Sequence, residues 1–301
     1  MRCDMEINEK PSNILQYSFD KVCGVSAETF PIGYCLPREN TGTLKSQKYE
    51  DCVACVISAL AEVMHKEQFG ENEEYSEGYA YGTLRGENSM REGMVIEQAL
   101  DLWRTVGCLP KKFFRLTAEM PEIKKLCDEY PELTEIAAKH TIKGYARIDY
   151  ADKLKRDRAV KTALTKYGHA LVAVSKNGFG KTAHCIQLVG WDDDSNKYII
   201  KNSYGEKYGD KGFGKIAKDK IDSIYLVLFD EITLPFADVK PDDWFYKAVK
   251  SMYCSGLING TSWLTFEPDK PLTRAEATVL IYRVIKEIDK RFDLAYKEAQ
   301  T

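Results

Sequence analysis

Residues 52–66 constrain the fold of this chain more than any other segment. Their apolar side chains recur at helical spacing, and small side chains fill the positions between them. The apolar positions are Val53, Val56, Ile57, Leu60, Val63 and Met64, and the small ones are Ala54, Ser58, Ala59 and Ala61. A helix that is apolar on most sides is buried on most sides. The segment therefore predicts a central helix with the rest of a domain packed around it.

The remaining signals place helices before strands. Residues 93–106 keep helical spacing, and residues 118–139 predict a third helix that prolines interrupt. The later part of the chain has short apolar or β-branched runs between turn clusters, at residues 170–174, 185–190, 197–201 and 223–229. The polar run 192–196 predicts a hairpin turn between two of these strands. Helices followed by strands indicate an α+β domain in two halves.

A smaller unit follows the break at Thr233-Leu234-Pro235. Residues 241–256 predict one helix, and Thr273-Arg274-Ala275-Glu276 predicts the start of another. The latter is a capping box, in which the Thr hydroxyl and the Glu carboxylate each satisfy a free backbone N–H. This helix–loop–helix module has about 55 residues, which is marginal for folding alone. We expect a first domain at 1–233, a second at 234–290 and a charged tail at 291–301.

Length and charge agree with this division and exclude several classes. The chain has 301 residues, enough for two domains or for one with an appendage. Its net charge of −3 gives no global attraction to nucleic acid or anionic lipid. The longest apolar run is too short to span a bilayer, and the N-terminus carries charges where a signal peptide needs an apolar segment. We expect no nucleic-acid partner, no membrane span and no export signal in this chain.

The nine cysteines are scattered, and only Cys52 and Cys55 lie close together in sequence. Without a signal peptide, we interpret most of them as reduced and buried, with one reactive thiol. Cys52 stands at the predicted start of the central helix. The helix dipole is expected to lower the pKa of a thiol at that position. Cys52 is therefore the candidate nucleophile.

A histidine and an asparagine are predicted to meet on neighbouring strands. His184 heads an apolar strand, and Asn202 follows eighteen residues later, beyond the predicted hairpin turn. Two strands joined by a hairpin bring these residues side by side, so that the amide oxygen of Asn202 can accept from the imidazole and orient it. His169 also begins an apolar strand but lacks a following Asn-Ser-aromatic-Gly, so we interpret it as structural. A thiol, a base, an orienting group and oxyanion donors are what acyl-bond cleavage by cysteine requires.

At these residues the sequence resembles the papain-like cysteine proteases, peptidase family C1. The family motifs are a Gln shortly before Cys-Trp-Ala-Phe with a Glu ten residues after the Cys, His-Ala-x-x-x-Val-Gly-[Tyr/Trp], and Lys-Asn-Ser-Trp-Gly-x-x-Trp-Gly-x-x-Gly. The matching segments are Gln47, Cys52-Val53-Ala54-Cys55, Glu62, residues 184–191 and residues 201–212. The resemblance covers most of residues 15–230. It implies a papain-like two-lobed fold, with a helical lobe and a β-barrel-like lobe.

The resemblance also implies an activity and assigns roles. It implies a cysteine peptidase in which Cys52 and His184 form a thiolate–imidazolium pair oriented by Asn202. The Gln47 side chain and the Cys52 backbone N–H would hold the oxyanion, and Gly93 would pair with the substrate backbone. The substrate would be a peptide or protein, and no cofactor or metal is implied.

The sequence departs from the family pattern in ways that leave alternatives. Gln47 stands five residues before Cys52, where the family usually has six, and Val53 and Tyr204 replace tryptophans. In one signature of this family, the nucleophile is the second Cys of a C-x-x-C, which would select Cys55. Glu62 would then no longer stand ten residues after the nucleophile, as the family motif requires. We favour Cys52 and interpret Cys55 as a core residue. A thioredoxin-like C-x-x-C would need a preceding strand, for which the polar residues before Cys52 are unsuited.

The C-terminal module resembles a single S-layer homology (SLH) domain. Such domains usually bind bacterial secondary cell-wall polysaccharide, and Asp238, Trp244 and Arg274 match positions implicated in that family. An aromatic face suits a sugar ring, and Arg suits an acidic or pyruvylated group. The alternative is that these three residues are structural. The family normally presents three copies, so one copy implies a homotrimer for anchoring, or another contact.

We therefore predict a bacterial or phage cysteine peptidase whose C-terminal module contacts cell-wall polysaccharide or another copy of the chain. The module indicates a cell-surface or cell-wall location, and the charged N-terminus leaves a cytoplasmic location as the alternative. Two other functional classes stay open. One is a catalytically silent papain-like binding protein, because Gln47 and Tyr204 depart from the pattern. The other is a cell-wall scaffold.

Overall fold

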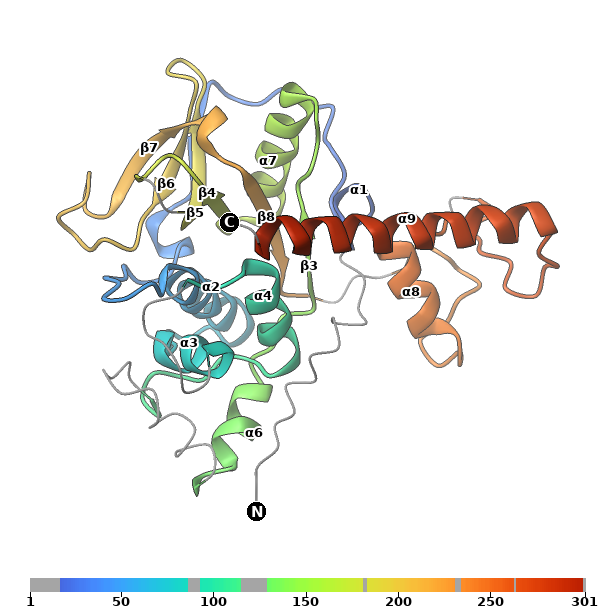
Figure 1. Ribbon diagram of the computed structural model, residues 1–301, viewed down its shortest axis with the longest axis horizontal. Helices are drawn as coiled ribbons and strands as arrows, with labels where there is room; N and C mark the ends of the chain where they lie inside the picture. The colour runs from blue at the N-terminus through green and yellow to red at the C-terminus, as the bar shows by residue number, and fades with distance from the viewer. Residues whose placement is uncertain are drawn as a thin grey trace. The chain divides into compact units, whose positions relative to one another are not determined.

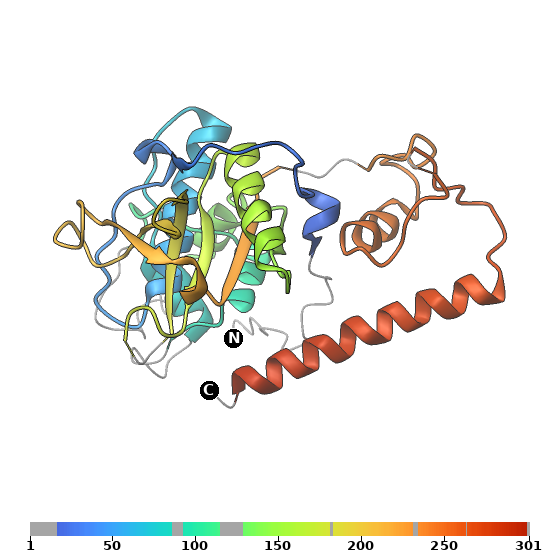
Figure 2. The ribbon, with the colours of Figure 1, turned by 90° about the horizontal axis from the view of Figure 1, so that it is seen from above.

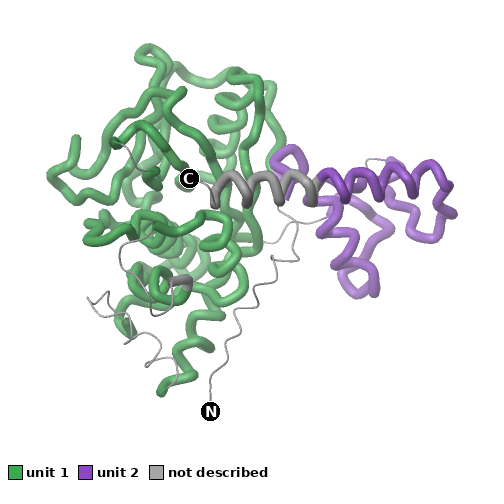
Figure 3. The backbone as a smooth tube through the Cα atoms, viewed as in Figure 1, with its two compact units in different colours: residues 1–12, 23–231 green, residues 13–22, 232–301 purple. Residues whose placement is uncertain are grey.

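The structure forms two compact units. This computed structural model describes residues 17–85, 93–114, 129–180, 183–230, 234–262 and 264–299, with the side chains of 84, 85 and 287–299 left out. Within these residues, unit 1 covers 23–230, and unit 2 covers 234–299 together with 17–22 (Figure 3). Unit 2 therefore combines a segment from near the start of the chain with its C-terminal part.

The central helix of unit 1 is α2 (Cys52–Phe69), as the sequence predicts. All of its residues from Cys52 to Met64 are buried, on every face of the helix. The helix ends at Gly70, whose left-handed conformation (φ 72°) suits glycine. Helices α3 (Glu77–Arg85) and α4 (Ile96–Thr105) pack against α2 and against each other, which forms a helical layer (Figure 1).

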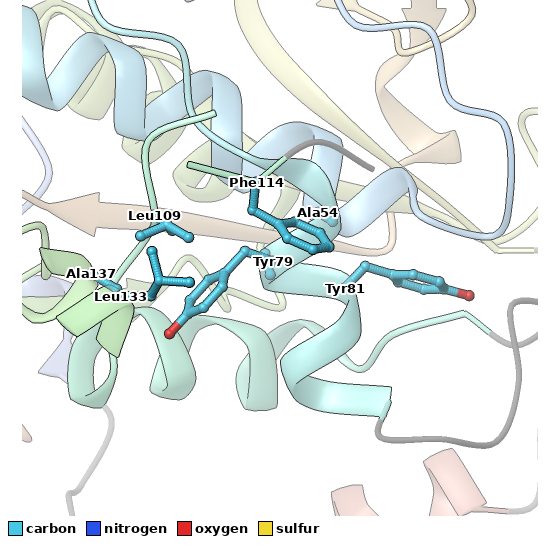
Figure 4. Packing of buried hydrophobic residues seen from close by; sticks show 8 residues of the cluster. Ala54, Tyr79, Tyr81, Leu109, Phe114, Leu133 and Ala137 are labelled. Atoms are coloured by element: carbon cyan, nitrogen blue, oxygen red, sulfur yellow. The ribbon is translucent and has the colours of Figure 1, made fainter. Parts of the chain in front are cut away.

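A cluster of buried side chains ties these helices to α6 (Glu132–Ala138), the described part of the helix predicted at 118–139. Figure 4 shows the cluster: its labelled members are Ala54, Tyr79, Tyr81, Leu109, Phe114, Leu133 and Ala137. The predicted residues 118–128 lie outside the described part of the chain. Helix α3 was not predicted, because two glycines weaken its helical pattern, and burial of its tyrosines offsets that weakness.

The second half of unit 1 is an antiparallel sheet (Figure 1). Its main path runs in the order β3-β8-β4-β5-β6-β7, and β2 (Gly33–Cys35) pairs with β5. The other strands are β3 (Gly144–Arg147), β4 (Leu171–Ser175), β5 (His184–Asp192), β6 (Lys197–Lys201), β7 (Phe213–Ala217) and β8 (Ser223–Leu228). The four predicted strands are present, and the turn at 192–196 joins β5 to β6. The α+β class with a helical part and a sheet part is therefore confirmed.

Helix α7 (Lys153–Tyr167) interrupts the region that the sequence assigned to strands. The side chain of Asp152 caps it by accepting from the N–H groups of Leu154 and Lys155. Its buried side chains include Ala159, Val160, Ala163 and Leu164, and the helix packs against β5. The helical spacing of these four residues was overlooked among the many charges of the segment.

The described part of unit 2 contains two longer helices, the short helix α1 (Phe19–Val22) and the two-residue strand β1 (Tyr17–Ser18). Helix α8 (Tyr246–Cys254) begins later than the predicted residue 241, because Asp243 instead accepts from the Lys240 N–H at 2.6 Å in a turn. The segments β1 and α1 contact α8, and Lys21 Nζ donates to Asn259 Oδ1 at 2.5 Å. A small core of Leu234, Phe236, Val239 and Val249 lies beside α8.

Helix α9 (Arg274–Ala299) is a single long rod in Figure 2 and continues through the segment that the sequence assigned to a tail. The predicted capping box is present at its start. The Thr273 N–H donates to Glu276 Oε2 at 2.8 Å, and the Glu276 N–H donates to Thr273 Oγ1 at 3.2 Å. Among the described helices, none is both long enough and apolar enough to cross a membrane.

Candidate active site

Cys52 is the first residue of α2 and is 7% exposed. Burial raises the pKa of its thiol, and the N–H groups of Cys185 and Val53, which act to lower that pKa, do not offset this. The charges of Asp51 and Glu50 raise it further. Burial therefore opposes the lowering of the pKa expected from the helix dipole, because desolvation penalises the thiolate.

His184 and Asn202 lie together, on adjacent strands. His184 begins β5, Asn202 directly follows β6, and the two strands pair through the hairpin. His184 Nε2 donates to Asn202 Oδ1 at 2.7 Å, and the Ser203 N–H donates to the same oxygen at 2.7 Å. Burial lowers the pKa of His184, whereas the Asn202 bond and the charge of Glu50 raise it. Because Nε2 is held by Asn202, Nδ1 is the nitrogen left to exchange a proton.

Aromatic rings enclose the His184–Asn202 pair. Tyr204 stacks on the imidazole, with centroids 4.7 Å apart and planes at 17°. Phe179 meets the imidazole edge-on at 4.9 Å, and Tyr208 lies 5.8 Å from Tyr204. Sequence reasoning matched Tyr204 to the motif but missed Phe179. Phe179 comes from a loop, where no regular spacing marks a contact with the site.

Gln47 reaches the site by pairing with the segment after Asn202. The Gln47 N–H donates to Ser203 O at 2.8 Å, and the Gly205 N–H donates to Lys45 O at 3.1 Å. The side chain is also fixed, since Ser203 Oγ donates to Gln47 Oε1 at 2.5 Å and Gln47 Nε2 donates to Tyr49 O at 3.1 Å. An amide NH₂ has two protons, so the bond to Tyr49 leaves one for an oxyanion.

A buried network of charges holds the strand segment that carries Gln47. Lys201 Nζ donates to the carbonyl oxygens of residues 41, 42 and 43 at 2.6, 2.7 and 2.8 Å. Glu62 on α2 accepts from the Thr43 N–H at 2.5 Å and pairs with Lys45 Nζ at 2.5 Å. Burial lowers the pKa of Lys201 to about 7. These residues position the site, and their role was missed although Lys201 and Glu62 belong to matched motifs.

Gly42 allows this segment to approach the central helix. Its φ of +71° is in the left-handed region, and a Cβ placed there would lie 2.1 Å from Ala59 O on α2. Only glycine fits such a close contact between two backbones. The contact, together with the bonds of Thr43 and Lys45 to Glu62, holds the segment that leads to Gln47 against α2.

Other candidate residues are placed as follows. Gly93 is exposed just before α4, and a Cβ placed there would meet no atom within 4 Å. His169 is fully buried and stacks on Phe229 at 4.3 Å, and burial lowers its pKa to about 4. Cys55 is 3% exposed within the helical core. Across the described residues, no three His, Cys, Asp or Glu side chains gather in a way that could hold a metal ion.

Comparison with known proteins identifies the family. The profile of the papain family cysteine proteases matches residues 45–226, more than half of the chain, and this range contains Gln47, Cys52, His184 and Asn202. The chain belongs to the papain family of cysteine proteases. Members of this family are hydrolases of peptide bonds, so this chain carries a peptidase domain. The profile of the S-layer homology domain matches residues 235–278.

Solved structures support the same fold for the papain-family domain. Xylellain, a cysteine protease from Xylella fastidiosa, aligns with a TM-score of 0.55 and 15% identity, over 72% of this chain and 92% of that one. Digestive procathepsin L 3 of Tenebrio molitor aligns with a TM-score of 0.54 and 15% identity, over 72% and 74%. An endoglucanase of Bacillus sp. (strain KSM-635) is 43% identical over 49 residues, which are 16% of this chain and 5% of that protein.

Within the SLH domain, the three candidate wall-binding residues differ in their surroundings. Asp238 accepts from the Phe266 N–H at 2.9 Å and the Glu267 N–H at 2.7 Å, so its carboxylate holds a loop. Trp244 is 93% exposed, and Arg274 is exposed at the start of α9. The structural alternative therefore fits Asp238, whereas Trp244 and Arg274 are accessible to a ligand.

Proposed function

We propose that the papain-family domain is an active cysteine peptidase that uses Cys52 as nucleophile and His184 as base. The observation that carries the proposal is the 2.7 Å bond from His184 Nε2 to Asn202, covered by the Tyr204 ring. This bond fixes the imidazole tautomer, and so it directs Nδ1 as the proton acceptor. A catalytically silent binding protein would not need an imidazole oriented in this way.

The proposed reaction follows from these residues. Cys52 gives its proton to His184 Nδ1, and the thiolate attacks the peptide carbonyl. The Cys52 backbone N–H and the second proton of Gln47 Nε2 bind the oxyanion. The imidazolium then protonates the leaving amine, and a thioester remains on Cys52. Water, deprotonated by His184, hydrolyses the thioester, which restores the thiol. Asn202 acts through His184 and contacts no reacting atom.

A pair of cysteine variants tests the assignment. We expect Cys52→Ala to abolish peptide hydrolysis and labelling by an electrophilic peptide inhibitor. Cys55→Ser is the matched control, since the two cysteines share one helical turn, and it should retain both. His184→Ala should lose turnover as Cys52→Ala does. Activity that survives Cys52→Ala, or that is lost in Cys55→Ser alone, contradicts the proposal.

We further propose that the SLH domain attaches the peptidase to acidic cell-wall polysaccharide through Trp244 and Arg274. The nearly complete exposure of Trp244 supports this, because an exposed indole can stack on a sugar ring. The proposed location is the cell surface or cell wall. We expect the full chain to sediment with purified cell wall and Trp244→Ala to remain in solution. The control is Leu264→Ala, an exposed apolar side chain of the same domain outside α9; equal sedimentation of all three proteins contradicts the proposal.

The same domain is proposed to form a homotrimer through α9. Four large apolar side chains of this helix are 49–59% exposed: Val279, Ile281, Tyr282 and Ile285. Burial of such residues against two other copies would remove apolar surface from water, and would bring three SLH domains together. Analytical ultracentrifugation of the full chain should give a trimer, which Ile281→Lys should dissociate. A wild-type monomer at micromolar concentration contradicts the trimer.

A further inference from the structure

Cys52 and Cys55 occupy the first turn of α2, one helical turn apart. Helix geometry places the Cα atoms of residues i and i+3 about 5 Å apart. This separation falls inside the range of about 4.4–6.8 Å that a disulfide spans. The two thiols also interact electrostatically, since charge on Cys52 raises the pKa of Cys55. Both are free cysteines in this structure.

The start of the helix allows the small movement that a bond between them requires. Side chains three residues apart on a helix have Cβ atoms about 5–6 Å apart. A disulfide needs roughly 3.5–4.5 Å, so the turn must tighten by about 1 Å. The first N–H groups of a helix have no carbonyl four residues back. Within this turn, the Cys55 N–H bond to Asp51 O, at 2.9 Å, is the helical bond that has to adjust.

Asp51 supplies a proton acceptor for Cys55. Its Oδ2 lies 3.9 Å from Cys55 Sγ, and its side chain is 1% exposed. Cys55 and Asp51 both line a cavity of about 410 Å³, which also contains Lys45, Glu77 and Lys111. A small polar molecule can therefore reach Cys55. Burial and the charges of Asp51 and Glu77 keep the Cys55 thiol protonated at rest, and Asp51 Oδ2 lies where it can accept that proton when the thiol reacts.

We propose that Cys52 and Cys55 form a reversible oxidation site, in which Cys55 converts the peroxide-oxidised nucleophile into a disulfide. The proposal rests on Cys52 as the nucleophile of the proposed function. While the disulfide exists, no Cys52 thiolate can attack a peptide. The bond also protects Cys52 from further oxidation to sulfinic acid, which is not readily reversed.

The reaction uses a hydroperoxide as oxidant and balances in two steps. The Cys52 thiolate attacks the terminal peroxide oxygen, so that an S–O bond forms, the O–O bond breaks and water or an alcohol leaves. Asp51 then takes the proton of Cys55, whose thiolate attacks Cys52 Sγ. The S–S bond forms, the S–O bond breaks, and hydroxide leaves and collects the proton as water. Two thiols lose two electrons to one peroxide, and an external dithiol reverses the change.

Cys185 is the competing partner, because its backbone N–H binds the Cys52 sulfur. Its side chain is badly placed for a disulfide. Neighbouring residues of a strand point to opposite faces of the sheet. The charge of Cys52 also raises the pKa of Cys185. However, the His184 side chain is directed toward Asn202, so the Cys185 side chain leaves β5 on the opposite face, where Cys185 pairs in register with Val174 on β4. Cys55 is therefore the resolving residue.

The test reads the bond directly by mass. Trypsin releases residues 49–66 as one peptide that contains both cysteines. After treatment of the full chain with hydrogen peroxide, we expect the mass of this peptide to fall by two hydrogen atoms, and dithiothreitol should restore the original mass.

The variants test the role of each residue. In Cys55→Ser, Cys52 should instead react with dimedone and progress to sulfinic acid, and the protein should lose activity permanently. Cys185→Ser is the matched control and should form the disulfide as the wild type does. Asp51→Asn should slow closure and prolong dimedone labelling.

The outcomes separate this proposal from the proposed peptidase function. Oxidation of wild-type Cys52 to sulfinic acid as readily as in Cys55→Ser overturns the reversible site, as does a disulfide that links residues 49–66 to the peptide with Cys185. The mass change is read whether or not the chain cleaves peptides. A chain that forms the disulfide without peptidase activity contradicts the proposed function alone, and an active chain without the disulfide contradicts this inference alone.

Discussion

The ring of Tyr204 lies nearly parallel to the imidazole of His184, with centroids 4.7 Å apart and planes at 17°. Tyr204 stands where the papain family motif has tryptophan, and it is 43% exposed. The stack covers one face of the imidazole, and the edge of Phe179 approaches it at 4.9 Å. Together they keep the imidazole in the plane that the bond to Asn202 requires.

Removal of the Tyr204 ring should weaken this orientation. We expect Tyr204→Ala to lower kcat about tenfold, because water then competes for the Asn202 amide and about 1.4 kcal/mol of orientation is lost. Tyr204→Trp should retain or increase kcat, since the larger ring covers the same bond. Steady-state kinetics on one peptide substrate gives both values. Tyr208→Ala serves as control, because Tyr208 contacts Tyr204. An equal loss of kcat in both alanine variants contradicts a specific role of the Tyr204–His184 stack.

Ser203 should affect the oxyanion through Gln47. Its hydroxyl donates to Gln47 Oε1 at 2.5 Å and so fixes the amide with its N–H groups toward the site. We expect Ser203→Ala to lower kcat about tenfold with little change in KM, less than the 10²–10³-fold typical for loss of an oxyanion donor. Gln47→Ala should give that larger loss. In the Gln47→Ala background, Ser203→Ala should cause no further loss of kcat, because Ser203 acts through Gln47. If the two losses of kcat add fully in the double variant, Ser203 does not act through Gln47.

Glu50 should set the pH range of activity. Its charge raises the pKa of Cys52 and that of His184. Glu50→Gln lowers both pKa values, so both limbs of the pH profile, which the Cys52 thiol and the His184 imidazole set together, should move to lower pH. The shift should be about half a unit or less and should shrink at high salt. A pH profile of kcat/KM measures it, with exposed Glu39→Gln as control. Limbs that move in opposite directions refute the assignment.

His169 should make the domain sensitive to acid. Burial lowers its pKa from 6.5 to about 4, so the unfolded chain binds a proton in this range that the folded chain does not. Stability is therefore intact above pH 6.5 and falls as the pH drops toward 4, by about 3 kcal/mol in total. Urea unfolding at several pH values should show a smaller acid loss in His169→Gln than in wild type. Parallel curves for the two proteins would exclude His169 as the cause.

Asp238 and Trp244 should separate stability from ligand binding in the SLH domain. Asp238→Ala removes the acceptor of two backbone N–H groups, and we expect it to destabilise unit 2 by about 1–3 kcal/mol. Trp244→Ala should leave stability unchanged, since its side chain is 93% exposed. Hydrogen exchange over residues 234–262 of the full chain distinguishes the two variants, because only Asp238→Ala should exchange faster than the wild type. Faster exchange in Trp244→Ala than in Asp238→Ala contradicts this division of roles.

The sequence by itself determined the parts that depend on local spacing. The apolar pattern of residues 52–66 predicted α2, because a helix with apolar side chains on every face is stable only when it is surrounded. The turn at 192–196 predicted that His184 and Asn202 would meet, because a hairpin fixes which residues of its two strands are neighbours. The capping box at Thr273 was readable because its two bonds join residues three apart.

Only the tertiary structure decided what depends on contacts between distant segments. Gln47 enters the site because residues 45–47 pair with 203–205, which its spacing from Cys52 does not reveal. Phe179 comes from a loop, and unit 2 includes residues 17–22, which are more than 200 positions from α8. Burial is also a tertiary property. The sequence placed Cys52 at a helix N-terminus, but its enclosure raises the thiol pKa, because desolvation depends on all the surrounding atoms.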